Sequence, residues 1–201
     1  MKPRLRYGGL LAVATAALAL TGWSAIASYP FQPESRLWID GTSTLRSFTC
    51  EAETLSGGVV PKGAAAELSL DRLGEAVGSA EAVVPVAALE CGNGTMNDHM
   101  RKALKADENP QIRFALSSYE VGPMNGANRS VTLVGGLTIA GQEKPVTFHG
   151  TATQEPSGAM RVVGSTEIVM TEYGMKPPRL MLGTLRVGDR VTVNYDVVVK
   201  P

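Results

Sequence analysis

The sequence lacks the short motifs that identify most hydrolases and nucleotide-binding enzymes. Its 201 residues include no Gly-x-Ser-x-Gly elbow, no Walker phosphate loop and no His-Glu-x-x-His helix. Only two histidines are present, His99 and His149. Asp98 and His99 are adjacent on a predicted helix, where neighbouring side chains diverge by about 100° and do not form a dyad. We therefore predict a binding protein rather than an enzyme, with His99 on a solvated helix face and His149 pointing outward from a strand.

The chain also lacks an apolar run that is long enough to cross a membrane. The run Leu10–Leu20 is well short of the roughly 20 residues that span a bilayer. The basic residues Lys2, Arg4 and Arg6 precede it, and Ala25–Ala27 supplies a small-x-small cleavage pattern, which together are typical of a secretory signal peptide. We predict cleavage after Ala27 and export, with the periplasm as the expected compartment; an uncleaved anchor is the alternative.

An excess of positive charge is absent as well. The full chain carries 19 Lys+Arg and 19 Asp+Glu, and the predicted signal peptide holds three basic and no acidic residues, so the mature charge is near −3. A nucleic-acid partner would require a basic stripe or patch. We therefore predict that the protein does not bind nucleic acid.

Cysteine is scarce, with Cys50 and Cys91 only, and no Cys-x-x-Cys motif indicates redox catalysis. An even count in an exported protein predicts one disulfide, with two buried free thiols as the alternative. The bridge would close a loop of 41 positions and stabilise the fold by about 3–4 kcal/mol in the chain-entropy model. Met96, His99 and Met100 offer soft ligands for Cu(I), but both methionines belong to an apolar stripe, and we predict no metal site.

What the sequence does contain is alternation of apolar and polar residues, which is typical of half-buried antiparallel strands. The clearest cases are 111–121, 130–141 and 189–199, and further candidates are 36–43, 43–61, 64–73, 80–89, 144–154 and 161–172. Their inward faces are Ile112, Phe114 and Leu116; Val131, Leu133, Leu137 and Ile139; and Val191, Val193, Tyr195, Val197 and Val199. Turns are expected at 156–158 and 188–189. Many evenly spaced strands without an internal repeat predict an all-β sandwich or closed barrel.

One segment, about 95–106, has helical periodicity instead. Met96, Met100 and Leu104 recur every four residues, which predicts a short amphipathic helix. Thr95 is the expected N-cap, and Asn109-Pro110 ends the helix. The pattern does not say whether this helix plugs or flanks the barrel.

Methionines cluster on this helix and on the segment 170–183, which also contains Pro177-Pro178. Methionine side chains either fill irregular core gaps or line surfaces that adapt to an apolar guest. We interpret 170–183 as a stiff rim at the mouth of a barrel, because an eight-stranded barrel has room for side chains or for one small ligand. Lys176 and Arg179, which flank the two prolines, are the candidate contacts for a ligand head group.

Four segments resemble the YceI-like family of exported, lipocalin-like proteins. They are WIDGTSTLRSFTC, VPVAALECGNGTMNDHMRKALKADENPQIRF, GGLTIAGQEKPV and MTEYGMKPPRLMLGTLRVGDRVTVNYDV, and the similarity runs over nearly all of the mature chain. The resemblance implies an antiparallel β-barrel of about eight strands whose apolar tunnel holds a long isoprenoid lipid, either a prenyl-quinone or a polyprenyl phosphate. Carried over by position, the residues that line the tunnel are Met96, Met100, Leu104, Phe114, Leu116, Ile139, Ile168, Met170, Tyr173, Met175 and Met181.

These inferences divide the chain into a signal peptide (1–27), a flexible lead-in (28–36) and a lipid-binding β-barrel domain (37–201). The expected ligand is an isoprenoid lipid for carriage, storage or sensing, with no further cofactor. A transient inner-membrane partner is possible, and the expected state is a monomer or homodimer. The first alternative is an envelope stress or interaction protein with a fully packed barrel, and the second is an enzyme that acts on a bound lipid.

Overall fold

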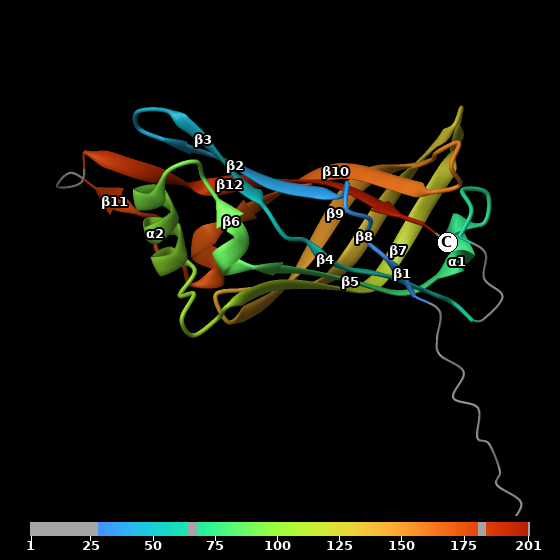
Figure 1. The fold of residues 1–201 in the computed structure, drawn as a ribbon, viewed down its shortest axis with the longest axis horizontal. Coiled ribbons are helices and arrows are strands. Elements are labelled where there is room, and N and C mark those ends of the chain that lie inside the picture. The colour runs from blue at the N-terminus through green and yellow to red at the C-terminus, as the bar shows by residue number, and fades with distance from the viewer. Residues whose placement is uncertain (1–27, 64–67, 181–183, 201) are drawn as a thin grey trace, which may run out of the picture.

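The computed structural model describes residues 28–63, 68–180 and 184–200. The predicted signal peptide and Met181 lie outside these residues. Among the described residues, no helix is both long and apolar enough to cross a membrane. The molecule is an elongated tube of antiparallel strands, with the helix α2 (Gly94–Ala103) at one end and α1 (Leu73–Ala76) at the other (Figure 1).

Antiparallel pairs build the whole sheet, whose strands follow the order β1-β4-β5-β7-β8-β9-β10-β12-β2-β3-β6, with β11 paired to β12 off this path. The strands are β1 (Tyr29–Pro30), β2 (Arg36–Ser43), β3 (Ser47–Ala52), β4 (Ser56–Pro61), β5 (Val77–Pro85), β6 (Leu89–Glu90), β7 (Gln111–Asn125), β8 (Asn128–Ile139), β9 (Gln142–Gln154), β10 (Met160–Val169), β11 (Arg179–Leu180) and β12 (Leu185–Val199). Two short 3-10 helices, η1 (Val86–Ala88) and η2 (Met170–Tyr173), complete the fold. The predicted class, an all-β antiparallel barrel with one short helix, is confirmed.

The described residues form nine strands of six residues or more, one above the expected eight, together with three two-residue strands. β1, β6 and β11 each contain two residues, too few to show a period in the sequence. Three other expectations are wrong. Segment 43–61 forms two strands rather than one, residues 68–73 lead into α1 instead of forming a strand, and the turn expected at 188–189 is a bulge inside β12.

Residues 28–36, expected to be a flexible lead-in, instead help to close the barrel. Tyr29 pairs with Val59 of β4, and Phe31 forms a bridge to Val199 of β12. The amide of Phe31 donates to the carbonyl of Gly57, so this segment joins β4 to β12 at the α1 end. At the α2 end, β6 follows β5 through η1 and pairs with β3. Both ends of the sheet order are therefore connected back into the wall.

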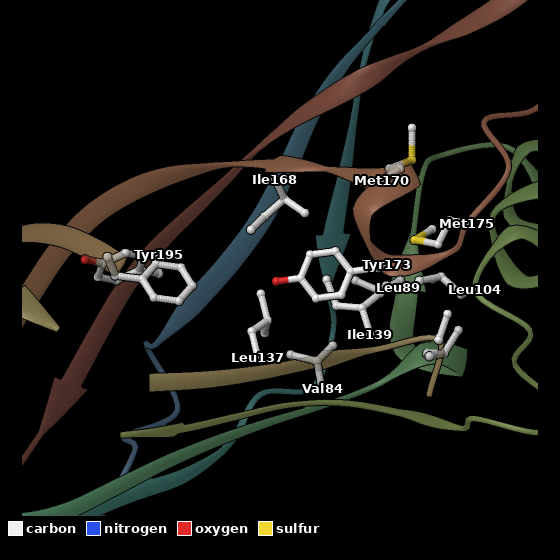
Figure 2. Packing of buried hydrophobic residues seen from close by; sticks show 13 residues of the cluster. Val84, Leu89, Leu104, Leu137, Ile139, Ile168, Met170, Tyr173, Met175 and Tyr195 are labelled. Carbon is white, nitrogen blue, oxygen red and sulfur yellow. The ribbon is translucent and has the colours of Figure 1, made fainter. Parts of the chain in front are cut away.

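Two apolar clusters occupy the inside of the tube. The larger one lies toward the α2 end, where Tyr173 points from η2 into a group that includes Leu137, Ile139 and Ile168 (Figure 2). The smaller one lies at the α1 end and contains Leu73. Apolar side chains from α1, α2 and η2 thus close the ends of a barrel whose strands alone would leave them open.

Candidate ligand-binding cavity

A cavity of about 460 Å³ runs inside the barrel. This volume lies within the range of roughly 300–1,000 Å³ that is usual for small-molecule sites. Every residue that the alternation placed on the inward faces of 111–121, 130–141 and 189–199 lines it. The lining extends from Met96 of α2 to Leu73 of α1, so the cavity has the length and the apolar character that a chain-like ligand requires.

Three aromatic side chains in the cavity wall lie over glycines of neighbouring strands. Phe48 faces Gly41 directly across the β2–β3 pair, and Tyr195 faces Gly164 across the β10–β12 pair. A Cβ on Gly41 would lie 2.8 Å from Cε2 of Phe48, and a Cβ on Gly164 would lie 2.6 Å from Cζ of Tyr195. The ring of Phe114 also lies over Gly135, although Phe114 itself pairs with Leu137. Because the glycines have no side chain, the rings lie against the wall and leave the interior open.

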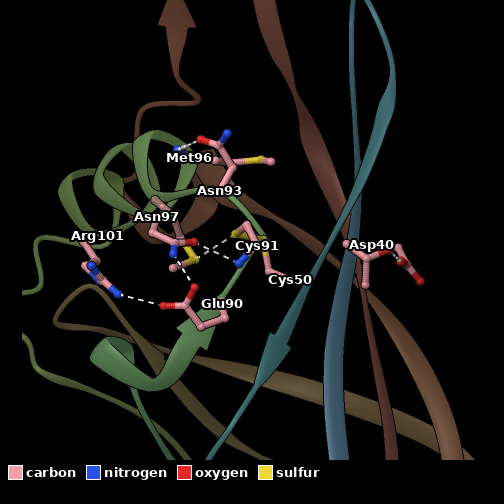
Figure 3. Close-up of a disulfide and its surroundings, with 10 residues drawn as sticks. Asp40, Cys50, Glu90, Cys91, Asn93, Met96, Asn97 and Arg101 are labelled. Carbon is pink, nitrogen blue, oxygen red and sulfur yellow. Dashed lines mark hydrogen bonds and ion pairs between the residues drawn. A yellow bond between two sulfur atoms is a disulfide. The ribbon is translucent and has the colours of Figure 1, made fainter.

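The helix α2 is held at its end of the tube by one covalent bond and several polar contacts. Cys50 of β3 and Cys91 form a disulfide, which confirms the predicted bridge. The side chain of Asn97, 5% exposed, accepts a hydrogen bond from the amide of Cys91 at 2.8 Å and donates to the carboxylate of Glu90 (Figure 3). Arg101 also contacts Glu90 at 3.2 Å. These contacts aim the apolar stripe of α2 into the cavity.

The start of α2 differs by two residues from the expectation. Asn93, not Thr95, is the N-cap, and its side-chain oxygen accepts a hydrogen bond from the amide of Met96 at 3.2 Å. The helix ends at Ala103 with Leu104 as the C-cap. Because the stripe lines the cavity, α2 closes the end of the barrel rather than lying along its outer wall.

Most of the residues predicted to line a tunnel do line the cavity. They are Met96, Met100, Leu104, Phe114, Leu116, Ile139, Ile168, Met170 and Met175. Tyr173 is buried in the adjacent cluster and is not part of the lining. Lys176 and Arg179 are exposed and do not line it either, because the rim folds differently from the expectation: η2 turns back at Gly174, and β11 places Arg179 opposite Arg186.

The sequence analysis missed or misplaced several lining residues, among them Arg46 and His99. Arg46, in the β2–β3 turn, lines the cavity, although no period marks a turn residue as inward. His99, expected on a solvated face, is half-buried and lines the cavity, and its Nδ1 is fully buried without a hydrogen-bond partner. His149 is exposed, as expected, and its nearest polar neighbour is Thr132 Oγ1 at 3.4 Å.

The interior is a strongly apolar environment for the groups inside it. Burial raises the pKa of Tyr195 to about 12, and burial together with the charge of Glu172 raises the pKa of Tyr173. Tyr195 Oη is buried and has no hydrogen-bond partner among the described residues. Among the described residues, neither histidine has a Ser or Asp hydrogen-bond partner inside the cavity, the arrangement that a lipid-acting hydrolase would use.

A comparison with protein-family models identifies the family to which this chain belongs. The model of the YceI-like domain matches residues 39–199. The chain belongs to the YceI-like family. No curated protein matches it with significance.

Solved structures of the YceI-like fold agree with this membership. BcnA of Burkholderia cenocepacia is 21% identical with a TM-score of 0.63, and the match covers 82% of this chain and 95% of BcnA. A polyisoprenoid-binding domain of Saccharophagus degradans is 14% identical with a TM-score of 0.64, covering 86% of this chain and 97% of that domain. A YceI protein of Campylobacter jejuni is 16% identical, with a TM-score of 0.54 and coverages of 76% and 84%. At these identities the likeness is one of fold.

Proposed function

We propose that this YceI-like protein binds a long-chain isoprenoid lipid inside its barrel, in the periplasm, and carries, stores or senses it there. The observation that carries the proposal is the apolar cavity along the barrel, lined by the inward faces of the long strands. The Saccharophagus degradans domain of the same fold is described as polyisoprenoid-binding, which supports the ligand class. The Cys50–Cys91 disulfide is consistent with an oxidising compartment.

Binding of the isoprenoid chain in such a cavity does not require charged contacts along the length of the lipid. Each methylene that leaves water contributes about 0.8 kcal/mol before the costs of ordering the ligand. Methionines on α2 and η2, whose side chains are unbranched and polarizable, suit a flexible apolar guest at the closed end. A cavity of about 460 Å³ also argues against the alternative of a barrel packed fully by its own side chains.

The test is native mass spectrometry, with organic extraction, of the protein purified from a host that exports it. We expect a co-purifying prenyl lipid that is released by organic solvent. An apo mass, with no uptake of added prenyl lipids by a folded protein, would overturn the proposal and favour the interaction protein.

A matched pair of variants assigns the bound lipid to the cavity. Val193→Lys places a charge in the lining, whereas Val163→Lys places the same charge on an exposed position, 43% accessible, of the neighbouring strand. We expect lipid loss in Val193→Lys and retention in Val163→Lys, with circular dichroism confirming that both are folded. If Val193→Lys does not fold, Val193→Phe fills the same part of the cavity without a charge, and equal lipid content in all variants would contradict a lumenal site.

A further inference from the structure

Polar side chains in the cavity lining are few and unevenly placed. They are Ser43, Arg46, Glu81, Asn93, Thr95, His99, Tyr119 and Tyr195. Five of these belong to the β2–β3 turn or to α2 and its cap, at the same end of the tube (Figure 1). The remaining three lie on β5, β7 and β12.

Two of these three residues, Glu81 and Tyr119, have partners within the fold. Glu81 pairs with Arg113, and the hydroxyl of Tyr119 donates to the carbonyl of Leu73 at 3.0 Å and accepts from the amide of Val77 at 3.1 Å. The hydroxyl of Tyr195 lies against Gly150 and Gly164, so it points at the wall.

At the α2 end, two of the five polar residues have structural roles. Ser43 binds the backbone of its own turn, and Asn93 caps α2. The side chains of Arg46, Thr95 and His99 have no hydrogen-bond or ion-pair partner among the described residues. Nδ1 of His99 is fully buried and out of reach of a ligand, so the ring nitrogen that can meet a ligand in the cavity is Nε2. These are therefore the groups at this end that are available to a ligand.

The disulfide links the strand that follows the Arg46 turn to the segment that leads into α2. Cys50 lies four residues beyond Arg46 on β3, which is roughly 13 Å along the strand. Met100, next to His99, has its Sδ 3.7 Å from Sγ of Cys91. The turn that carries Arg46 and the helix that carries His99 are thus tied to the same sulfur bridge at the α2 end of the cavity.

We propose that Arg46 and His99, assisted by Thr95, form a subsite for the phosphate of a polyprenyl phosphate whose chain lies in the apolar cavity. This inference rests on the proposed function and names the polar end of its ligand. A guanidinium binds phosphate through two parallel charge-assisted hydrogen bonds, and because Arg46 is exposed, a phosphate bound to it stays partly hydrated. Nearby carboxylates are occupied, since Glu90 accepts from Asn97 and Arg101, and Asp98 lies 3.9 Å from Arg101.

The first experiment compares two ligands that differ only in the head group. Binding of a polyprenyl phosphate and of the neutral polyprenol with the same chain is measured by fluorescence competition on the purified, lipid-stripped protein. We expect the phosphate to bind at least about tenfold more tightly, because Arg46 adds a charge-assisted pair. Equal binding of the two lipids overturns the subsite but leaves the proposed function intact, whereas no binding of either lipid overturns the proposed function as well.

Single-residue variants then test which side chains cause the preference for polyprenyl phosphate over polyprenol. Arg46→Gln and His99→Leu should remove the preference for phosphate and leave the affinity for polyprenol unchanged. Arg179→Gln is the matched control, because Arg179 is an exposed arginine of the same end that does not line the cavity. A preference that persists in Arg46→Gln, or that is lost in Arg179→Gln, overturns the assignment. Competition with inorganic pyrophosphate tests whether the subsite binds a free anion instead of the head group of a lipid. If pyrophosphate, which has no lipid chain, competes by itself, the proposal that the bound phosphate belongs to a lipid in the cavity is overturned.

Discussion

Phe48 and the glycine that faces it show how single residues keep the cavity open. The three atoms nearest to a Cβ built on Gly41 all belong to the ring of Phe48, and Gly41 does not have a positive φ. Space, rather than backbone conformation, is therefore the reason for glycine at this position. The ring has no room to stay against the wall if the glycine gains a side chain, so it must turn toward the lumen.

Gly41→Ala should therefore cost about 1–3 kcal/mol of unfolding free energy through overpacking, and it should reduce lipid content. The cost should largely disappear in a Phe48→Ala background, because the contact no longer exists. Gly74→Ala in α1, where an added Cβ meets nothing within 4 Å, is the matched control and should be neutral or slightly stabilising. Urea denaturation of the wild type, the three single variants and the Gly41→Ala/Phe48→Ala double variant measures the stability costs, and organic extraction measures the lipid content. An unchanged cost in the Phe48→Ala background would show that the ring is not the obstacle.

The α2 element depends on a tether more than on its own helical stability. A ten-residue helix is short for independent stability in water, and most of its polar anchoring passes through Cys91, Asn97 and Glu90. The disulfide closes a loop of 41 positions between β3 and Cys91, which lies two residues before the helix cap Asn93. The position of α2 and its helical conformation therefore depend on the disulfide.

Replacing both cysteines by serine should lower the unfolding free energy by about 3–4 kcal/mol if the chain-entropy model holds. Amide hydrogen exchange should increase most over α2, because the helix loses its covalent link to β3. Treatment of the wild type with a reductant provides the independent comparison, and it should reproduce both changes. A uniform increase in exchange over the barrel, without a larger effect at α2, would contradict a local tether.

The wall of the barrel and the helix α2 could be predicted from the sequence, whereas the short strands at the ends could not. The inward residues of β7, β8 and β12 follow from alternation, since a strand with one buried face has a period of two. β1 and β11 are too short to carry a period, and the bulge at Gly188 resembles a turn because glycine favours both. Arg46 and His99 were missed for a related reason: a turn residue and a polar residue on a helix are assigned to solvent unless the tertiary packing is known.

At the scale of the whole molecule, the barrel is closed by contacts that no single hairpin provides. The β4 edge would be unpaired at the α1 end without the segment around Phe31. The amide of Phe31 donates to the carbonyl of Gly57, and the amide of Gln32 donates to the carbonyl of Val198, so two strands that are far apart in the sequence share one short connector. The side chain of Phe31 also lines the cavity at this end. The backbone of Phe31 therefore contributes to the barrel wall, and its side chain contributes to the cavity lining.

Phe31→Ala should open the α1 end while the α2 end stays closed. The ring packs against the smaller apolar cluster, and its half-buried position suggests a loss of about 2 kcal/mol, below the 3–5 kcal/mol of a fully buried phenylalanine. Hydrogen exchange should increase in β4 and in the last residues of β12, and change little in α2. Phe31→Leu, which keeps an apolar side chain, should preserve most of the protection. If exchange in β4 and β12 is the same in Phe31→Ala as in the wild type, the connector does not hold the barrel closed, and the ladder of long strands alone maintains the tube.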